Sequence, residues 1–274
     1  MTRRVAKSAQ APRRRAIPRL LLTGYAGLVY VFLYAPIAMI VLLSFNTADF
    51  IGFPIEGLGL VRYREAVASS EVLHAAINSV LLGMAAASIA TVLALGLALG
   101  FRYRFPLKGV VLQMILVPIV IPAVVGGVVL MVLFGYAEVS PGLWTTVLVA
   151  HVNWALPFAF LTLYPRVHRF DRSLEEAAMD LGARPALVLR RVVLPMMRPG
   201  IVATFLFSFT LSFDEFVRTL FVIGSDRTIP VLIWTLVIER NSPHLPAVGV
   251  LIMAATIVIA LIAFVTGERS RSAS

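Results

Sequence analysis

Long uncharged stretches constrain this chain more than any other feature of its sequence. A helix needs roughly 20 apolar residues to cross about 30 Å of hydrocarbon. Stretches of that length place predicted spans at residues 20–44, 76–100, 110–133, 143–165, 200–222 and 246–266. They lack the alternation of a barrel strand and exceed its length of about 10 residues. The sequence therefore predicts an all-α integral membrane protein with six transmembrane helices.

Composition excludes several other classes of protein. The chain is 59% hydrophobic and 14% charged, whereas a soluble domain carries about 25% charged residues. It has no cysteine, so disulfides and cysteine-ligated metals are excluded. The four histidines are scattered, without the spacing of a metal site. We therefore expect no metal and no cofactor in this chain.

The net charge of +10 comes from basic residues in short segments between the apolar stretches. Such a distribution indicates membrane topology and argues against a nucleic-acid partner. Residues 1–19, 101–109, 166–198 and the tail 267–274 hold most of the Lys and Arg. The positive-inside rule puts all four in the cytoplasm, together with both termini. The first apolar stretch is also compatible with a signal peptide, but its length favours an uncleaved anchor.

Two prolines interrupt the third predicted span. Pro118 and Pro122 each lack a backbone N–H, and a proline inside a helix kinks or breaks it. We therefore expect a kinked or locally broken helix at 110–133.

Segment 166–198 is the longest predicted cytoplasmic loop. Asp171 or Ser173 is suited to cap a short helix, and Gly182 to end it, because glycine readily adopts the left-handed conformation. A second amphipathic piece is expected to begin at Pro185. Leu194-Pro195 is expected to close that piece and redirect the chain into the fifth span. The pattern is also compatible with a basic loop that rests on anionic lipid.

Within this loop, seven residues form a spaced motif: Glu176, Ala177, Ala178, Gly182, Val192, Leu194 and Pro195. The motif and its place between the fourth and fifth spans resemble the EAA loop of type I binding-protein-dependent ABC transporter permeases. That family usually has Ile where this chain has Val192. The resemblance covers about residues 74–263, which implies the type I ABC importer permease fold.

The resemblance also implies partners. The short helix at 176–182 is then a coupling helix that docks on a separate ATPase dimer, with Glu176 available to a basic group and Ala177 and Ala178 allowing close packing. A second permease subunit and a periplasmic or lipid-anchored binding protein are expected, in a bacterial inner membrane. The chain has no GxxxxGK[ST] phosphate loop. We therefore expect ATP to be used by the partner, and this chain not to be an enzyme.

Two adjacent carboxylates near the outer end of the fifth span are candidates for substrate contact. Asp214 and Glu215 lie between Phe213 and Phe216, and carboxylates beside aromatic rings suit a small organic cation. Alternatively, Asp214 and Arg218 neutralise each other at i and i+4. Glu215 is also within reach of Arg218 at i+3.

Further residues bear on the substrate. Segments 213–216, 221–224 and 228–231 resemble the spermidine/putrescine permease branch, and parts are shared with ferric-ion, aminoethylphosphonate and opine permeases. An amino-acid-like solute is a further alternative. Asn153 and Trp154 are candidates to face the pathway, although a helix–helix hydrogen bond is the alternative for Asn153, as for the nearby His151.

Three other classes compete with the permease interpretation. A secondary transporter or channel predicts ionisable residues at the bilayer centre and often an internal repeat, and the sequence shows no repeat. A membrane-embedded enzyme needs a third partner for His151 and Asp214. A non-transporting anchor gives the EAA-like motif no purpose.

Overall fold

The computed structural model describes residues 19–240 and 242–272, and every regular element in this part of the chain is helical. Most of the predicted basic tail at 1–19, and residues 273–274 of the C-terminal tail, lie outside the described residues. The helices are α1 (Arg19–Ser44), α2 (Val61–Ala68), α3 (Ser70–Gly100), α4 (Lys108–Val120), α5 (Ala123–Tyr136), α6 (Leu148–His168), α7 (Ser173–Asp180), α8 (Pro185–Val188), α9 (Leu194–Phe213), α10 (Val217–Val222), α11 (Ile229–Thr235) and α12 (Leu245–Ser272). Short π-helical turns η1 (Leu143–Val147), η2 (Leu189–Val193) and η3 (Leu236–Arg240) adjoin α6, α9 and α11.

Several of these helices are long and apolar enough to cross a membrane. Four candidate spans lie within the described residues, at Leu21–Ser44, Ser70–Gly100, Leu143–His168 and Pro185–Phe213. The pair α4 and α5 makes a fifth if it counts as one span. In α12, the apolar stretch with described side chains is Leu245–Val258. The described part of the chain thus gives four or five spans, and the count of six stays a prediction.

The third predicted span, 110–133, is divided in the structure. α4 ends at Val120, and α5 begins after Pro122 at an angle of 109° to it. Pro122 has no N–H to continue the helix, and the residue before a proline is pushed into extended backbone. Ile121 accordingly has ψ 124°. The expected break lies at Pro122, whereas Pro118 is accommodated inside α4.

The fifth predicted span, 200–222, is corrected at both ends. The helix is continuous from Pro185 through α8, η2 and α9 to Phe213, so Leu194-Pro195 lies inside it and does not redirect the chain. The π-helical turn η2 ends at Val193, two residues before Pro195, and such turns relax the regular helical hydrogen-bond pattern that a proline interrupts. At the other end the helix stops at Phe213, and 217–222 forms the separate helix α10.

Small side chains let the central helices approach closely. Ala90, Ala94 and Ala98 of α3 are completely buried in a core shared with α6. A Cβ at Gly83 would lie 2.9 Å from the Phe209 ring of α9, so the absence of a side chain there brings α3 and α9 together.

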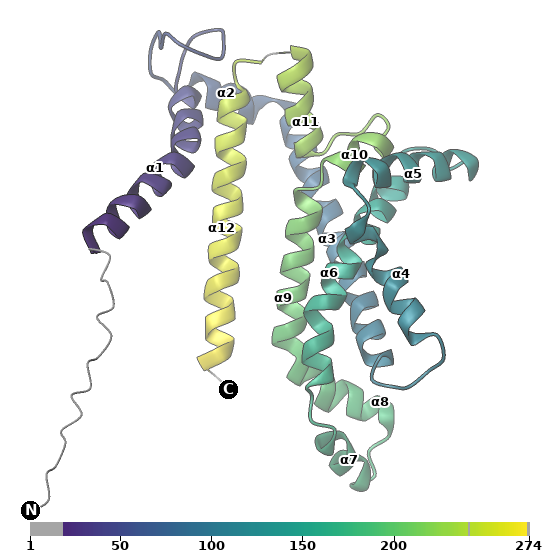
Figure 1. Ribbon diagram of the computed structural model, residues 1–274. Helices are drawn as coiled ribbons and strands as arrows, with labels where there is room; N and C mark the ends of the chain where they lie inside the picture. Colours follow the sequence, from purple (N-terminus) through teal and green to yellow (C-terminus); the bar gives the residue numbers. More distant parts are fainter. Residues whose placement is uncertain (1–18, 241, 273–274) are drawn as a thin grey trace, which may run out of the picture.

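Figure 1 shows how the helices are arranged. α3, α6 and α9 run side by side, and α7 and α8 form one end of the molecule beneath them. α2, α11 and the loop after α1 lie at the opposite end. α1 contacts α12, where Ile40 approaches Gly249, and its side chains are otherwise largely exposed.

Candidate functional site

α7 ends in a geometry that only a few residue types adopt. Gly182 has φ +85°, the left-handed conformation that glycine accepts without strain. Its N–H donates to the Met179 carbonyl at 2.8 Å, and the Ala183 N–H donates to the Ala178 carbonyl at 3.1 Å. These two bonds form a Schellman motif. Gly182 therefore ends this helix, as the sequence predicts.

The start of α7 is acidic. Asp171 Oδ1 accepts a hydrogen bond from the Ser173 N–H at 2.9 Å, and this bond lowers the pKa of the Asp171 carboxyl. Glu175 and Glu176 follow in the first turn. Negative charge at this end of a helix interacts favourably with the helix dipole.

None of the eight residues of α7 is buried, so its surface is open to a partner. Glu176 and Ala177 are exposed and Ala178 is half-buried. No ion pair of Glu176 occurs within the described residues. The remaining motif residues, Val192, Leu194 and Pro195, lie on η2 and α9 and not on this tip.

The structure adds Leu181 to the exposed end of α7. Its side chain is 90% exposed, so it is accessible at the same tip as Glu176 and Ala177. Sequence reasoning missed it, although a leucine directly before a helix-ending glycine in a polar loop was the available signal.

The two candidate carboxylates have different surroundings. Asp214 follows the last residue of α9 and is exposed, whereas Glu215 is buried. Glu215 Oε2 accepts from Arg218 Nη1 at 2.9 Å, and its Oε1 accepts from the Arg218 backbone N–H at 2.8 Å. Of the predicted alternatives, the i+3 pair of Glu215 and Arg218 forms. An Asp214–Arg218 ion pair is absent from the part of the chain that the structure describes.

Residues from α6 enclose this pair. The guanidinium carbon of Arg218 lies 3.9 Å from the centroid of the Trp154 ring, a cation–π contact. Trp154 therefore covers Arg218, and it also packs edge-on against Phe158. Asn153, one residue earlier, is exposed and has no hydrogen bond among the described side chains. The helix–helix hydrogen bond that was the alternative for Asn153 does not form.

His151 does form such bonds. Its Nδ1 lies 2.7 Å from Ser212 Oγ of α9, and its Nε2 lies 2.8 Å from Thr219 Oγ1 of α10. The Thr219 hydroxyl donates its proton to the Glu215 carbonyl at 2.7 Å. It must therefore accept from His151 Nε2–H, which leaves Nδ1 to accept from Ser212. This buried network joins three helices at the break between α9 and α10.

Asp214 faces a mainly apolar cavity of about 390 Å³. The cavity is lined by Phe213, Asp214, Phe216, Ile229, Pro230, Ile233, Trp234, Val237 and Ile252. Asp214 is the one charged residue in this lining, and the rings of Phe216 and Trp234 lie 5.4 Å apart. A carboxylate beside aromatic rings can bind an ammonium group by ion pairing and cation–π contact. Sequence reasoning missed Trp234 because it lies in an apolar stretch that carries no motif.

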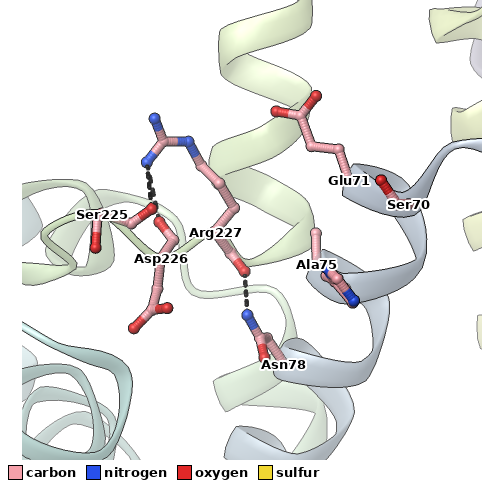
Figure 2. A pocket seen from close by; sticks show the side chains of 8 residues that line it. Ser70, Glu71, Ala75, Asn78, Ser225, Asp226 and Arg227 are labelled. Atoms are coloured by element: carbon pink, nitrogen blue, oxygen red, sulfur yellow. Dashed lines mark hydrogen bonds between the residues drawn. The ribbon is translucent and has the colours of Figure 1, made fainter.

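A polar cleft of about 550 Å³ lies at the N-terminal end of α3 (Figure 2). Asn78 Nδ2 donates to the Arg227 carbonyl at 3.0 Å, and Ser79 Oγ accepts from the Ile229 N–H at 2.8 Å. In Figure 2, Arg227 and Glu71 point to the same side of the cleft, and Asp226 points away from them. The two hydrogen bonds hold the start of α11 between this cleft and the cavity of Asp214.

Comparison with known proteins identifies relatives across most of the chain. The family described as "Binding-protein-dependent transport system inner membrane component" matches residues 90–267. The spermidine/putrescine transport system permease protein PotC of Escherichia coli (strain K12) is 33% identical over 247 residues, covering 89% of this chain and 93% of PotC. The putrescine transport system permease protein PotI of the same strain is 34% identical, covering 86% of each chain.

Solved structures share the fold. A chain of a bacterial ABC transporter involved in the import of the acidic polysaccharide alginate matches with a TM-score of 0.70 and 15% identity, covering 92% of this chain and 95% of that one. A chain of an alginate ABC transporter in complex with an alginate pentasaccharide-bound periplasmic protein matches with a TM-score of 0.71 and 14% identity, covering 92% and 94%. At these identities the likeness establishes the fold alone.

Proposed function

This chain belongs to the family of inner membrane components of binding-protein-dependent transport systems, and we propose that it forms half of the transmembrane pathway of an ATP-driven polyamine importer. A second permease subunit, alike or homologous, supplies the other half. A periplasmic or lipid-anchored binding protein delivers the substrate to the outer end. In this proposal the chain crosses the inner membrane of a bacterial cell six times, with α12 as the last crossing, and the positive-inside rule assigns both termini to the cytoplasm.

The projecting helix α7 carries the coupling part of this proposal. It offers Glu176, Ala177 and Leu181 to a partner at the end of the molecule where the sequence places the cytoplasm. Gly182 sets the direction in which the chain leaves this surface. α7 docks on a separate ATPase subunit, whose movement during ATP binding and hydrolysis is transmitted to the spans.

The carboxylate of Asp214 in its aromatic cavity carries the substrate part. An alkyl polyamine combines ammonium groups with methylene spacers, which match this carboxylate and the apolar walls around it. The relatives named for spermidine and putrescine support the same substrate class. Glu215, buried against Arg218, orders the neighbouring backbone and does not offer its charge to the substrate.

Copurification of the ATPase subunit tests the coupling role. Glu176→Lys and Gly182→Val are expected to lose the ATPase while the permease still inserts in the membrane. Gly182→Asn is the matched control, because asparagine tolerates the left-handed conformation better than valine. If both loss variants retain the ATPase, α7 is not the docking helix.

Uptake of radiolabelled spermidine and putrescine tests the substrate role. Asp214→Asn in the complete system is expected to lower uptake, while Asp214→Glu retains part of it. Glu56→Gln, an exposed carboxylate in the outer loop, is the control for loss of outer charge. Full uptake by Asp214→Asn contradicts a cation site there. ATP-dependent uptake of iron, an aminoethylphosphonate, an opine or an amino acid in place of polyamines contradicts the substrate class.

A further inference from the structure

The turn that follows α3 is tied directly to α7, although 73 positions separate the two residues involved. Arg102 Nη2 lies 2.5 Å from Glu175 Oε1, and the two side chains are only 8% and 21% exposed. A second contact joins the same segments: Arg172, directly before α7, donates a hydrogen bond from its Nη2 to the Arg102 carbonyl at 2.8 Å. Arg102 is therefore held at its side chain and at its backbone by the start of the coupling helix.

The contact between Arg102 and Glu175 is an ion pair between two partly buried side chains, which strengthens their Coulombic attraction relative to an exposed pair. The Arg102 guanidinium also lies 5.8 Å from the centroid of the Phe170 ring.

On its other side, Arg102 is joined to the core of the bundle. The preceding residue, Phe101, is 3% exposed and packs edge-on against Phe105, Phe160 and Tyr164. Lys108 Nζ donates to the Phe101 carbonyl at 2.5 Å. Phe105 belongs to the turn and Lys108 begins α4, whereas Phe160 and Tyr164 belong to α6. Arg102 is thereby connected to α3, α4 and α6.

We infer that the Arg102–Glu175 pair is a clasp that transmits movement of α7 to the turn between α3 and α4. The main helix contacts of α7 are with α8 and η2, which continue into α9, and its own chain connects it to α6. The clasp adds a direct route to α3 and α4. Both members are positioning residues, and the inference rests on the proposed docking of α7 on an ATPase.

The test measures uptake per ATP hydrolysed, with the complete transporter reconstituted in proteoliposomes. Arg102→Gln and Glu175→Gln are expected to retain the ATPase and its hydrolysis. Uptake per ATP is expected to fall by about fivefold or more, the size of a typical coupling between sites. The charge reversal Arg102→Glu with Glu175→Arg is expected to restore the ratio, which a merely misfolded turn cannot do. Arg104→Gln, an exposed neighbour, is the control that leaves the ratio unchanged.

The outcomes separate the two proposals. An unchanged ratio in both single variants overturns the clasp and leaves the proposed function intact. Loss of the ATPase from Arg102→Gln also overturns it, because the pair then serves docking and not transmission. If the unaltered chain neither binds an ATPase nor supports ATP-driven uptake, the proposed function itself fails.

Discussion

Glu215 and Arg218, three positions apart, form a buried ion pair at the junction between the long helix α9 and α10. The pair uses both carboxylate oxygens of Glu215, one for the guanidinium and one for the backbone of Arg218. Its neighbour Asp214 is thereby left as the exposed carboxylate of the sequence motif. Two adjacent acidic residues thus have separate roles, one in the fold and one at the cavity.

Removing one member of this pair should destabilise the protein. Glu215→Gln leaves the Arg218 guanidinium buried without a counter-charge, at an expected cost of about 3 kcal/mol. Asp214→Asn, at an exposed position, should leave the melting temperature in detergent nearly unchanged. Glu215→Gln combined with Arg218→Met should recover part of the loss. Equal melting temperatures for all three variants would contradict the structural role.

Two substitutions in the hydrogen-bond network of His151 should lower the stability of the protein by different amounts. Ser212→Ala removes one hydrogen bond, at about 1 kcal/mol. Thr219→Val removes two, to His151 and to the Glu215 carbonyl, so its cost should be about 1 kcal/mol larger. Thermal unfolding of the purified variants measures the difference. Equal effects of the two changes argue against the assigned hydrogen-bond directions.

The close packing of α5 against α10 at Gly127 leaves no space for a side chain. A Cβ at this position would lie 2.5 Å from the Phe221 ring, so Gly127→Ala forces the helices apart, at about 1–3 kcal/mol. Gly135→Ala on the same helix is the control, because no atom lies within 4 Å of its Cβ position. Adding Phe221→Leu should relieve part of the loss in thermal stability. Tolerance of Gly127→Ala at full stability would show that α5 does not pack there.

Arg62 is expected to keep the loop after α1 in a fixed conformation. Its guanidinium donates to the carbonyls of Thr47 and Ala48 and pairs with Asp49 and Glu65. The hydrogen bond with Asp49 is the largest of the contacts that raise the pKa of Arg62. The guanidinium of Arg62 therefore stays charged. Arg62→Ala should therefore speed hydrogen exchange of the loop amides, measured by mass spectrometry.

The matched control for the outer loop is Arg64→Ala, two residues later and exposed. It should leave the exchange of segment 45–60 unchanged. The assignment fails if Arg62→Ala exchanges no faster than this control.

Local signals in the sequence predicted local structure well. Gly182 ends α7 because a left-handed residue is needed there, and Pro122 breaks the third span because it lacks an N–H. Leu194-Pro195 misled the prediction because the π-helical turn η2 lets the helix continue through Pro195. That turn depends on packing, which a single proline does not reveal.

The sequence by itself determined that this chain is a helical membrane protein, and it predicted a short polar helix on the cytoplasmic side, since apolar length, basic segments and turn residues act over short stretches. Only the tertiary structure decided which charges remain free. Glu215 and Asp214 are neighbours in the same motif, yet one is neutralised by Arg218 under Trp154 and the other faces a cavity completed by Trp234. Arg102 likewise met Glu175 only when the chain folded. The contacts of Trp154 with Arg218 and of Arg102 with Glu175 join segments far apart in the sequence, so no local pattern encodes them. The Glu215–Arg218 pair is local, and the structure decided only which of the two carboxylates takes Arg218.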